Sequence, residues 1–163
     1  MSNILIIVAA VAAFVISSVI GKFLIPELHR IKFGQPIRDE GPKWHQKKSG
    51  TPTMGGIMFI VAAVLVSVIC YAVLSIIEPG ARDFQDHLKF YAGIVMAVLF
   101  GVIGFIDDYI KVVKKHNQGL TEKQKLVLQF LVAIAYVFTL IIGGCSSKTV
   151  IPFAGTIDLG VFY

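Results

Sequence analysis

Four long runs of apolar residues dominate the chain, and shorter stretches between them hold most of the charge. The runs predict membrane-spanning helices, because such a helix needs roughly 20 mainly apolar residues. The sequence therefore predicts an all-α membrane protein, a polytopic helical bundle with a single membrane domain over residues 1–163. The four predicted transmembrane helices cover about residues 4–25, 57–77, 88–106 and 126–143.

The first apolar run has the position of a secretory signal peptide but not its composition. Residues 1–3 carry no Lys or Arg, and the apolar stretch that follows is too long for a secretory core segment. We therefore predict a retained helix that ends at Pro26.

Basic residues gather in two of the connecting loops, residues 26–56 and 107–125, whereas the loop between the second and third helices is mainly acidic. An excess of Lys and Arg marks the cytoplasmic side of a membrane protein. We predict that both basic loops are cytoplasmic and that the N-terminus lies outside. The aromatic residues do not interleave with the basic ones, so no nucleic-acid partner is predicted.

The C-terminal end differs from the rest of the chain. Residues 149–151 and 161–163 are β-branched or aromatic, and Gly155 and Gly160 lie between them. This pattern predicts a short external β-hairpin after the fourth helix.

Two adjacent carboxylates, Asp107 and Asp108, follow directly on the third apolar run. Ionisable groups at membrane depth are costly, which makes them functional candidates. If the helix continues to His116, Lys111 lies one turn further on, at i+4 and i+3 from the two acids. Such a group suits a phosphate and its magnesium ion. The alternative is a charge cluster that merely ends a helix.

The string KSGTPTMGG, residues 48–56, opens the second helix from the same side. A helix N-terminus presents free N–H groups that suit an anionic oxygen. Thr51 or Thr53 can cap the helix, and Lys48 adds a positive charge for a phosphate. The alternative is a flexible linker with an ordinary threonine cap.

Two further segments of the predicted cytoplasmic face carry candidate residues. His45 is a candidate contact to a substrate phosphate, although a surface histidine explains it as well. Residues 117–119 break the third helix, and Thr121 is a credible N-cap for the fourth. Lys123 and Lys125 lie where a lipid phosphate would lie, but the charge rule for cytoplasmic loops also explains both.

All these segments converge on one membrane boundary, which suits a reaction between a soluble nucleotide-linked substrate and a lipid phosphate. The strings GTPTMGG and DDYIKVVKKHNQGLTEKQK closely resemble the phospho-N-acetylmuramoyl-pentapeptide transferases of bacteria. These belong to the polyprenyl-phosphate N-acetylhexosamine-1-phosphate transferase superfamily. The resemblance runs along the whole chain, which corresponds to the N-terminal portion of such a transferase.

The resemblance implies transfer of phospho-MurNAc-pentapeptide from UDP-MurNAc-pentapeptide to undecaprenyl phosphate, giving lipid I and UMP for peptidoglycan synthesis. It also implies a Mg²⁺ cofactor, a multi-pass location in the bacterial inner membrane among membrane lipids, and a homodimer. Asp107 and Asp108 match the family's first acidic motif and are the predicted catalytic residues. One of them deprotonates the lipid phosphate, or either attacks directly or helps to hold the metal.

The other matched positions are basic or polar. Lys111 and Lys125 match residues of the family's active-site cleft, and Lys48 and Thr53 match positions beside the nucleotide. The full predicted substrate-binding set is Lys48, Thr51, Thr53, Lys111, Lys125 and His45.

The sequence departs from the family in one respect. The family's later motifs, an Asn/Asp-rich loop with the main metal-binding Asp and a His-rich loop, do not occur in these 163 residues. We therefore expect this chain alone to be inactive. Three alternatives stay open: a related UDP-GlcNAc:polyprenyl-phosphate GlcNAc-1-phosphate transferase, a transporter or channel subunit that uses the two acids as a relay, and a structural four-helix scaffold.

Overall fold

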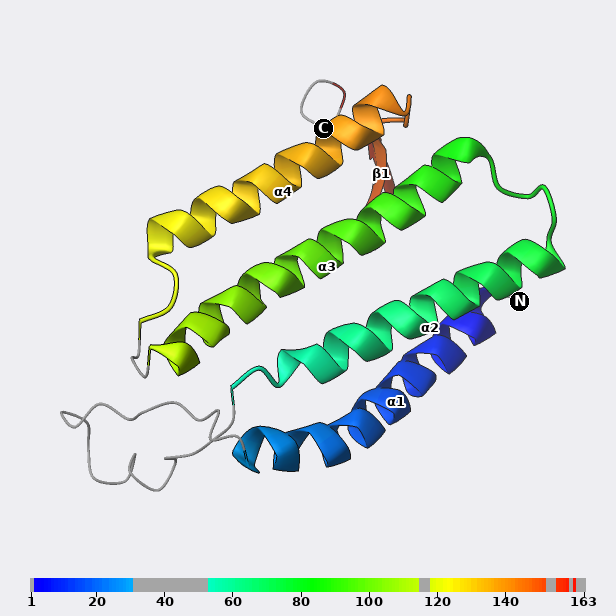
Figure 1. Cartoon of the computed structure of the whole chain (residues 1–163). Coiled ribbons are helices and arrows are strands. Elements are labelled where there is room, and N and C mark those ends of the chain that lie inside the picture. The colour runs from blue at the N-terminus through cyan, green and yellow to red at the C-terminus, as the bar shows by residue number, and fades with distance from the viewer. Residues whose placement is uncertain (1, 31–52, 115–117, 152–154, 159, 161–163) are drawn as a thin grey trace.

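The computed structural model describes residues 2–30, 53–114, 118–151, 155–158 and 160. Over these residues the chain forms four long helices that lie side by side and a two-stranded sheet (Figure 1). All four helices are long and apolar enough to cross a membrane, which confirms the predicted fold class. The elements are α1 (Ser2–Arg30), α2 (Gly56–Ile77), α3 (Phe84–Val113), α4 (Glu122–Ile142), β1 (Lys148–Ile151) and β2 (Gly155–Asp158).

The helices pack in chain order, α1 against α2, α2 against α3 and α3 against α4. A glycine allows the close approach of α3 to α2, because a Cβ built on Gly101 would lie 2.6 Å from Cδ1 of Ile60. Small residues at helix crossings are typical of membrane bundles.

The buried apolar core is small for a chain of this length. Within the described residues the buried hydrophobic side chains come from all four helices and the segment before α2, whereas most large apolar side chains are exposed. Water would oppose such exposure at about 25 cal/mol per Å², so these surfaces suit lipid or further protein. The buried set is Leu28, Met54, Ala62, Val66, Ile103 and Leu140.

The predicted bounds of the first and third helices are wrong. The first helix does not end at Pro26 but continues to Arg30; proline removes one hydrogen bond near the end of the helix, and an ion pair of 2.7 Å between Arg30 and Glu27 supports the last turn. The third helix begins at Phe84, where the Asp83 side chain accepts a hydrogen bond from the Asp86 N–H at 2.9 Å.

The same helix runs on to Val113, so the first seven residues of the predicted loop 107–125 are helical. At 1.5 Å per residue, the 30 residues of α3 measure about 45 Å, more than the roughly 30 Å of a bilayer core. The C-terminal turns of α3 therefore reach the edge of the bilayer while they stay helical.

The fourth helix begins with the predicted cap. Thr121 accepts a hydrogen bond from the Gln124 N–H at 3.2 Å, and the Gln124 side chain accepts one from the Thr121 N–H at 3.0 Å. This reciprocal capping box satisfies two N–H groups that the helix leaves open and fixes the start of α4.

A β-hairpin follows α4, as predicted, but its second strand was placed wrongly. β1 pairs antiparallel with β2 in a register that sets Lys148 opposite Asp158 and Ile151 opposite Gly155. The β-branched residues Thr156 and Ile157 supply the second strand. The predicted strand at 161–163 lies outside the described residues.

The far end of α2 and the start of α3 are joined by aromatic side chains. The Tyr71 ring stacks on Phe90 with 3.8 Å between centroids, and its hydroxyl is hydrogen-bonded to Nδ1 of His87 at 2.8 Å. The Arg82 guanidinium lies 5.4 Å from the Tyr71 ring centre. Tyrosine and arginine at a helix end are typical of a membrane interface, here the one opposite the two acids.

Candidate functional site

Asp107 and Asp108 lie on the C-terminal turns of α3. This end of α3 lies near the start of α2 and the start of α4 (Figure 1). Neighbouring residues on a helix point about 100° apart, so the two carboxylates face different partners. Asp107 is buried toward α4, with 8% of its side chain exposed, whereas Asp108 faces the start of α2 and is 28% exposed. One helix thus presents two acids in two environments.

Two lysines neutralise this pair. Lys111 Nζ lies 2.7 Å from Asp107 Oδ2 and 3.0 Å from Asp108 Oδ1, which confirms the predicted i+4 and i+3 geometry. Lys125 Nζ, from the first turns of α4, lies 3.1 Å from Asp107 Oδ2. Two carboxylates and two ammonium groups therefore form one charge-balanced cluster, in which the lysines are near enough to share an incoming anion.

Backbone N–H groups hold the remaining carboxylate oxygens. The Leu120 N–H donates to Asp107 Oδ1 at 2.9 Å, and the Met54 N–H donates to Asp108 Oδ2 at 3.2 Å. Every oxygen of the two acids thus accepts at least one hydrogen bond or ion pair. Such full satisfaction fixes the orientation of buried polar groups.

Met54 donates from an unusual backbone conformation. Its φ is 67°, a left-handed value that costs a non-glycine residue roughly 1–2 kcal/mol. The next residue, Gly55, is the N-cap of α2 and makes no side-chain cap hydrogen bond. The prediction that Thr51 or Thr53 caps α2 is therefore wrong, because Gly55 occupies the N-cap position. The backbone turn at Met54 instead directs an N–H toward Asp108.

The other predicted binding residues differ in what the structure says of them. Thr53 is buried beside Met54, so it belongs to the same corner of the site. Lys48, Thr51 and His45 lie outside the described residues. Their roles stay predictions.

A groove of about 500 Å³ leads from the acids along the bundle between α2 and α3. The described residues that line it are apolar or glycine, apart from Asp107 and Asp108 at one end. Gly104 lies in this groove, and a Cβ built there would meet nothing within 4 Å. The predicted convergence of the acids with the start of the second helix on one pocket is thus confirmed as geometry.

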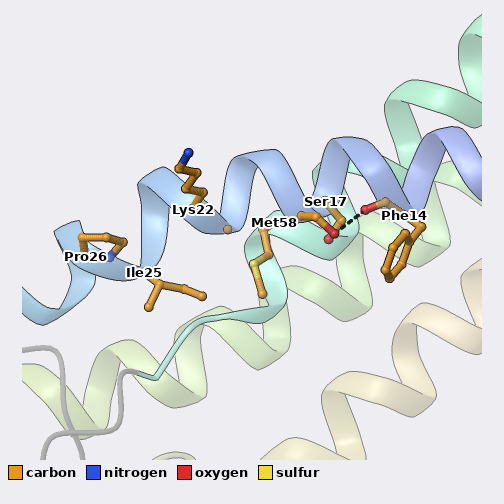
Figure 2. A pocket seen from close by; sticks show the side chains of 8 residues that line it. Phe14, Ser17, Lys22, Ile25, Pro26 and Met58 are labelled. Carbon is orange, nitrogen blue, oxygen red and sulfur yellow. Dashed lines mark hydrogen bonds between the residues drawn. The ribbon is translucent and has the colours of Figure 1, made fainter.

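A second groove, of about 440 Å³, lies between α1 and α2 (Figure 2). Its polar groups are Lys22 and two serines, and the Ser18 hydroxyl donates to the Phe14 carbonyl at 2.8 Å. None of the described residues that line it carries a carboxylate, so these residues do not offer the acid–lysine chemistry of the first groove.

The two acids fit magnesium as part of a site. Magnesium prefers oxygen ligands and is usually held by one or two carboxylates together with water and substrate phosphates. Among the described residues, however, no three His, Cys, Asp or Glu side chains lie close enough to hold a metal ion. Asp107 and Asp108 can therefore supply two ligand groups, provided that the lysines shift toward another anion.

Sequence reasoning missed three backbone contributions to this site: the N–H of Met54, the N–H of Leu120, and the close approach of Gly119 to Asp107. A backbone N–H leaves no mark in composition. The glycine was predicted only as a helix breaker, because its partner lies twelve residues earlier in the chain.

Comparison with known proteins gives one consistent family. Residues 48–60 match the family model described as phospho-N-acetylmuramoyl-pentapeptide-transferase signature 1. A protein of that name from Halalkalibacterium halodurans is 46% identical over 154 residues, which are 94% of this chain and 45% of the relative. The one from Bacillus anthracis is 52% identical over 134 residues, 81% of this chain and 38% of the relative.

A third such protein, from Bacillus thuringiensis, is 50% identical over 152 residues, 92% of this chain and 43% of the relative. The chain thus spans less than half the length of these curated relatives and matches their N-terminal part.

Proposed function

Because the chain belongs to the phospho-N-acetylmuramoyl-pentapeptide-transferase family of the bacterial inner membrane, we propose that it supplies the phosphate-handling part of that active site. The proposed reaction transfers phospho-MurNAc-pentapeptide from UDP-MurNAc-pentapeptide to undecaprenyl phosphate and yields lipid I and UMP. The observation that carries the proposal is the cluster of two acids and two lysines at the end of the α2–α3 groove.

The lysines bind the anionic substrates. Lys111 and Lys125 place two ammonium groups within 3.1 Å of one carboxylate oxygen, and charge-assisted hydrogen bonds to phosphate are about twice as strong as neutral ones. When phosphate oxygens enter, these lysines exchange part of their contact with the acids for contact with the substrate. Binding and positioning of two phosphate groups then lower the entropic barrier to reaction.

The acids have different tasks in the proposed reaction. Asp107 contacts both lysines and is itself held by the Leu120 N–H. Its task in the proposal is to orient the two lysines toward the substrate phosphates. Asp108 is the more exposed of the two and accepts the proton of the lipid phosphate, whose second pKa is about 6. An oxygen of that phosphate then forms a bond to the sugar-side phosphorus of the donor. The bond from this phosphorus to the bridging oxygen breaks, and its electron pair leaves with UMP.

Magnesium, when bound, supplies positive charge that stabilises the phosphate oxygens and the leaving UMP. Asp107 and Asp108 are the residues of this chain that would hold it, together with ligands from substrate and water.

The groove supports a lipid substrate. Its apolar walls between α2 and α3 suit a prenyl chain, and its polar end, where Lys111 lies beside the acids, suits the phosphate group of that lipid. This arrangement lets the apolar part of the acceptor stay in the bilayer while its phosphate meets a donor from the cytoplasm.

The test is UMP release by the protein as its gene encodes it, in membranes or detergent. Release from UDP-MurNAc-pentapeptide should require undecaprenyl phosphate and magnesium, and Asp107→Asn or Asp108→Asn should each abolish it. Equal turnover with UDP-GlcNAc would favour the related GlcNAc-1-phosphate transferase instead. Full turnover in both Asn variants would remove the acids from the mechanism, and no release at all would favour the relay or scaffold alternatives.

Two accompanying predictions concern the chain itself. The 163 residues alone should show no turnover, since the chain spans less than half the length of its relatives. The homodimer stays a prediction that chemical cross-linking in native membranes would test.

A further inference from the structure

The segment before α4 passes unusually close to Asp107. A Cβ built on Gly119 would lie 2.6 Å from the Asp107 backbone oxygen and 2.8 Å from its Cγ, and it would also meet Oδ1. Real Cβ atoms do not approach other atoms this closely. A side chain of any kind at position 119 therefore requires the loop or the acid to move.

Neither the Asp107 backbone oxygen nor its carboxyl group can move without losing other contacts. The backbone oxygen belongs to helix α3, and the carboxyl group is held by Lys111, Lys125 and the Leu120 N–H. Gly119 itself has no left-handed φ, so alanine is compatible with its backbone conformation. The glycine is needed because of the space that Asp107 occupies.

The close approach has a direct consequence for the next residues. Leu120 follows Gly119 and donates its N–H to Asp107 Oδ1 at 2.9 Å. Thr121 then caps α4, and Lys125 reaches Asp107 Oδ2 at 3.1 Å one turn later. The position of residue 119 thus sets where both oxygens of this carboxylate find their α4-side partners.

We propose that Gly119 is a positioning residue: its missing side chain lets the segment before α4 approach Asp107 closely enough for Leu120 and Lys125 to hold both carboxylate oxygens. The structural part of this inference stands on the contacts alone, and its effect on turnover rests on the proposed function. Gly119 touches no substrate in the proposal and acts through Asp107 and Lys125.

The first test is thermal unfolding of the protein as its gene encodes it. Gly119→Ala adds one methyl group to a closely packed site, so its Tm should lie about 5 °C below that of the wild type. In an Asp107→Ala background, which removes the carboxyl group but leaves the backbone oxygen that the methyl also meets, Gly119→Ala should lower Tm by less than it does in the wild type. The matched control is Gly93→Ala on α3, where a built Cβ meets nothing within 4 Å, and its Tm should not fall.

The second test is kinetic. A reacting group displaced by about 1 Å can lose about 100-fold in rate, so Gly119→Ala should lower kcat at least 10-fold while KM for the nucleotide donor changes less than about threefold. Gly93→Ala should keep wild-type turnover.

These outcomes separate the two proposals. Equal Tm losses from Gly119→Ala with and without the Asp107 carboxyl group, or no loss at all, would overturn the positioning role. Absence of turnover in wild type and in Gly93→Ala would instead overturn the proposed function, while thermal coupling between positions 119 and 107 would persist.

Discussion

Replacement of Lys111 by methionine should destabilise the site more than the same replacement of Lys125 or Lys114. Lys111 Nζ contacts both acids, at 2.7 and 3.0 Å, and its side chain is only 19% exposed. Exposed ion pairs contribute about 0.2–1 kcal/mol, whereas breaking a fully buried pair costs about 3–5 kcal/mol. The intermediate burial gives an expected loss of about 2 kcal/mol, because the variant leaves two adjacent carboxylates beside one remaining ammonium group.

Replacement of Lys125 gives a smaller stability loss with which the loss from Lys111→Met can be compared. Lys125 makes its contact at 3.1 Å and is 40% exposed, so Lys125→Met should cost about 1 kcal/mol or less. At about 2–4 °C per kcal/mol for a chain of this size, the Tm losses should be about 4–8 °C for Lys111→Met and about 2–4 °C for Lys125→Met. Lys114→Met, at the exposed C-cap of α3, is the matched control with no expected loss.

Thermal unfolding in detergent, followed by circular dichroism at 222 nm, measures all three. Adding Asp107→Asn to Lys111→Met should recover part of the loss, since it removes one of the uncompensated charges. If Lys125→Met or Lys114→Met cost as much as Lys111→Met, or if Asp107→Asn brought no recovery, the bridging role of Lys111 would be refuted.

Three further predictions concern separate parts of the structure. Thr121→Ala removes the capping box of α4 and should lower the free energy of unfolding, measured with urea or heat, by about 1 kcal/mol. Thr121→Ser keeps a hydroxyl cap and should retain most of that stability. Equal losses in both variants would show that the cap does not stabilise the helix. Gly101→Ala places a methyl group 2.6 Å from Ile60 Cδ1 and should lower Tm. Ile60→Val removes that Cδ1 atom, so it should restore the lost Tm in the Gly101→Ala background. No restoration would show that the strain arises at another contact. The pKa of Asp158 is held below its ordinary value by hydrogen bonds from the Ser147 hydroxyl and the Gly160 N–H. The stabilisation of the hairpin end by Asp158 is therefore complete above about pH 4 and is lost as the pH falls through the lowered pKa. Carboxyl NMR titration of Ser147→Ala should show the pKa rising, and an unchanged pKa would contradict this cause.

Hydropathy was sufficient to predict the number and type of the helices, because a spanning helix must be apolar over most of its length. It was not sufficient to predict the residues at which the helices begin and end. Charge at Asp107 ended the apolar run but not the helix, since a helix can continue beyond the bilayer edge when its polar side chains find partners there. Pro26 likewise ended the predicted helix but not the real one.

The candidate site was predictable where side chains on one helix were involved. The i+3 and i+4 spacing placed Lys111 against both acids correctly. The contacts from Met54 and Leu120 come from backbone N–H groups 54 and 13 residues away along the chain. These contacts depend on how the segments before α2 and α4 pack against α3, and the pattern of side chains in the sequence does not predict that packing.

In the proposed function the cluster of Asp107, Asp108, Lys111 and Lys125 binds phosphate groups. Equilibrium binding of undecaprenyl phosphate to the purified protein, measured without the nucleotide donor, tests this role. We expect the double variant Lys111→Met/Lys125→Met to bind at least 10-fold more weakly than wild type and Lys114→Met to bind as tightly as wild type. Unchanged affinity in the double variant would contradict this role.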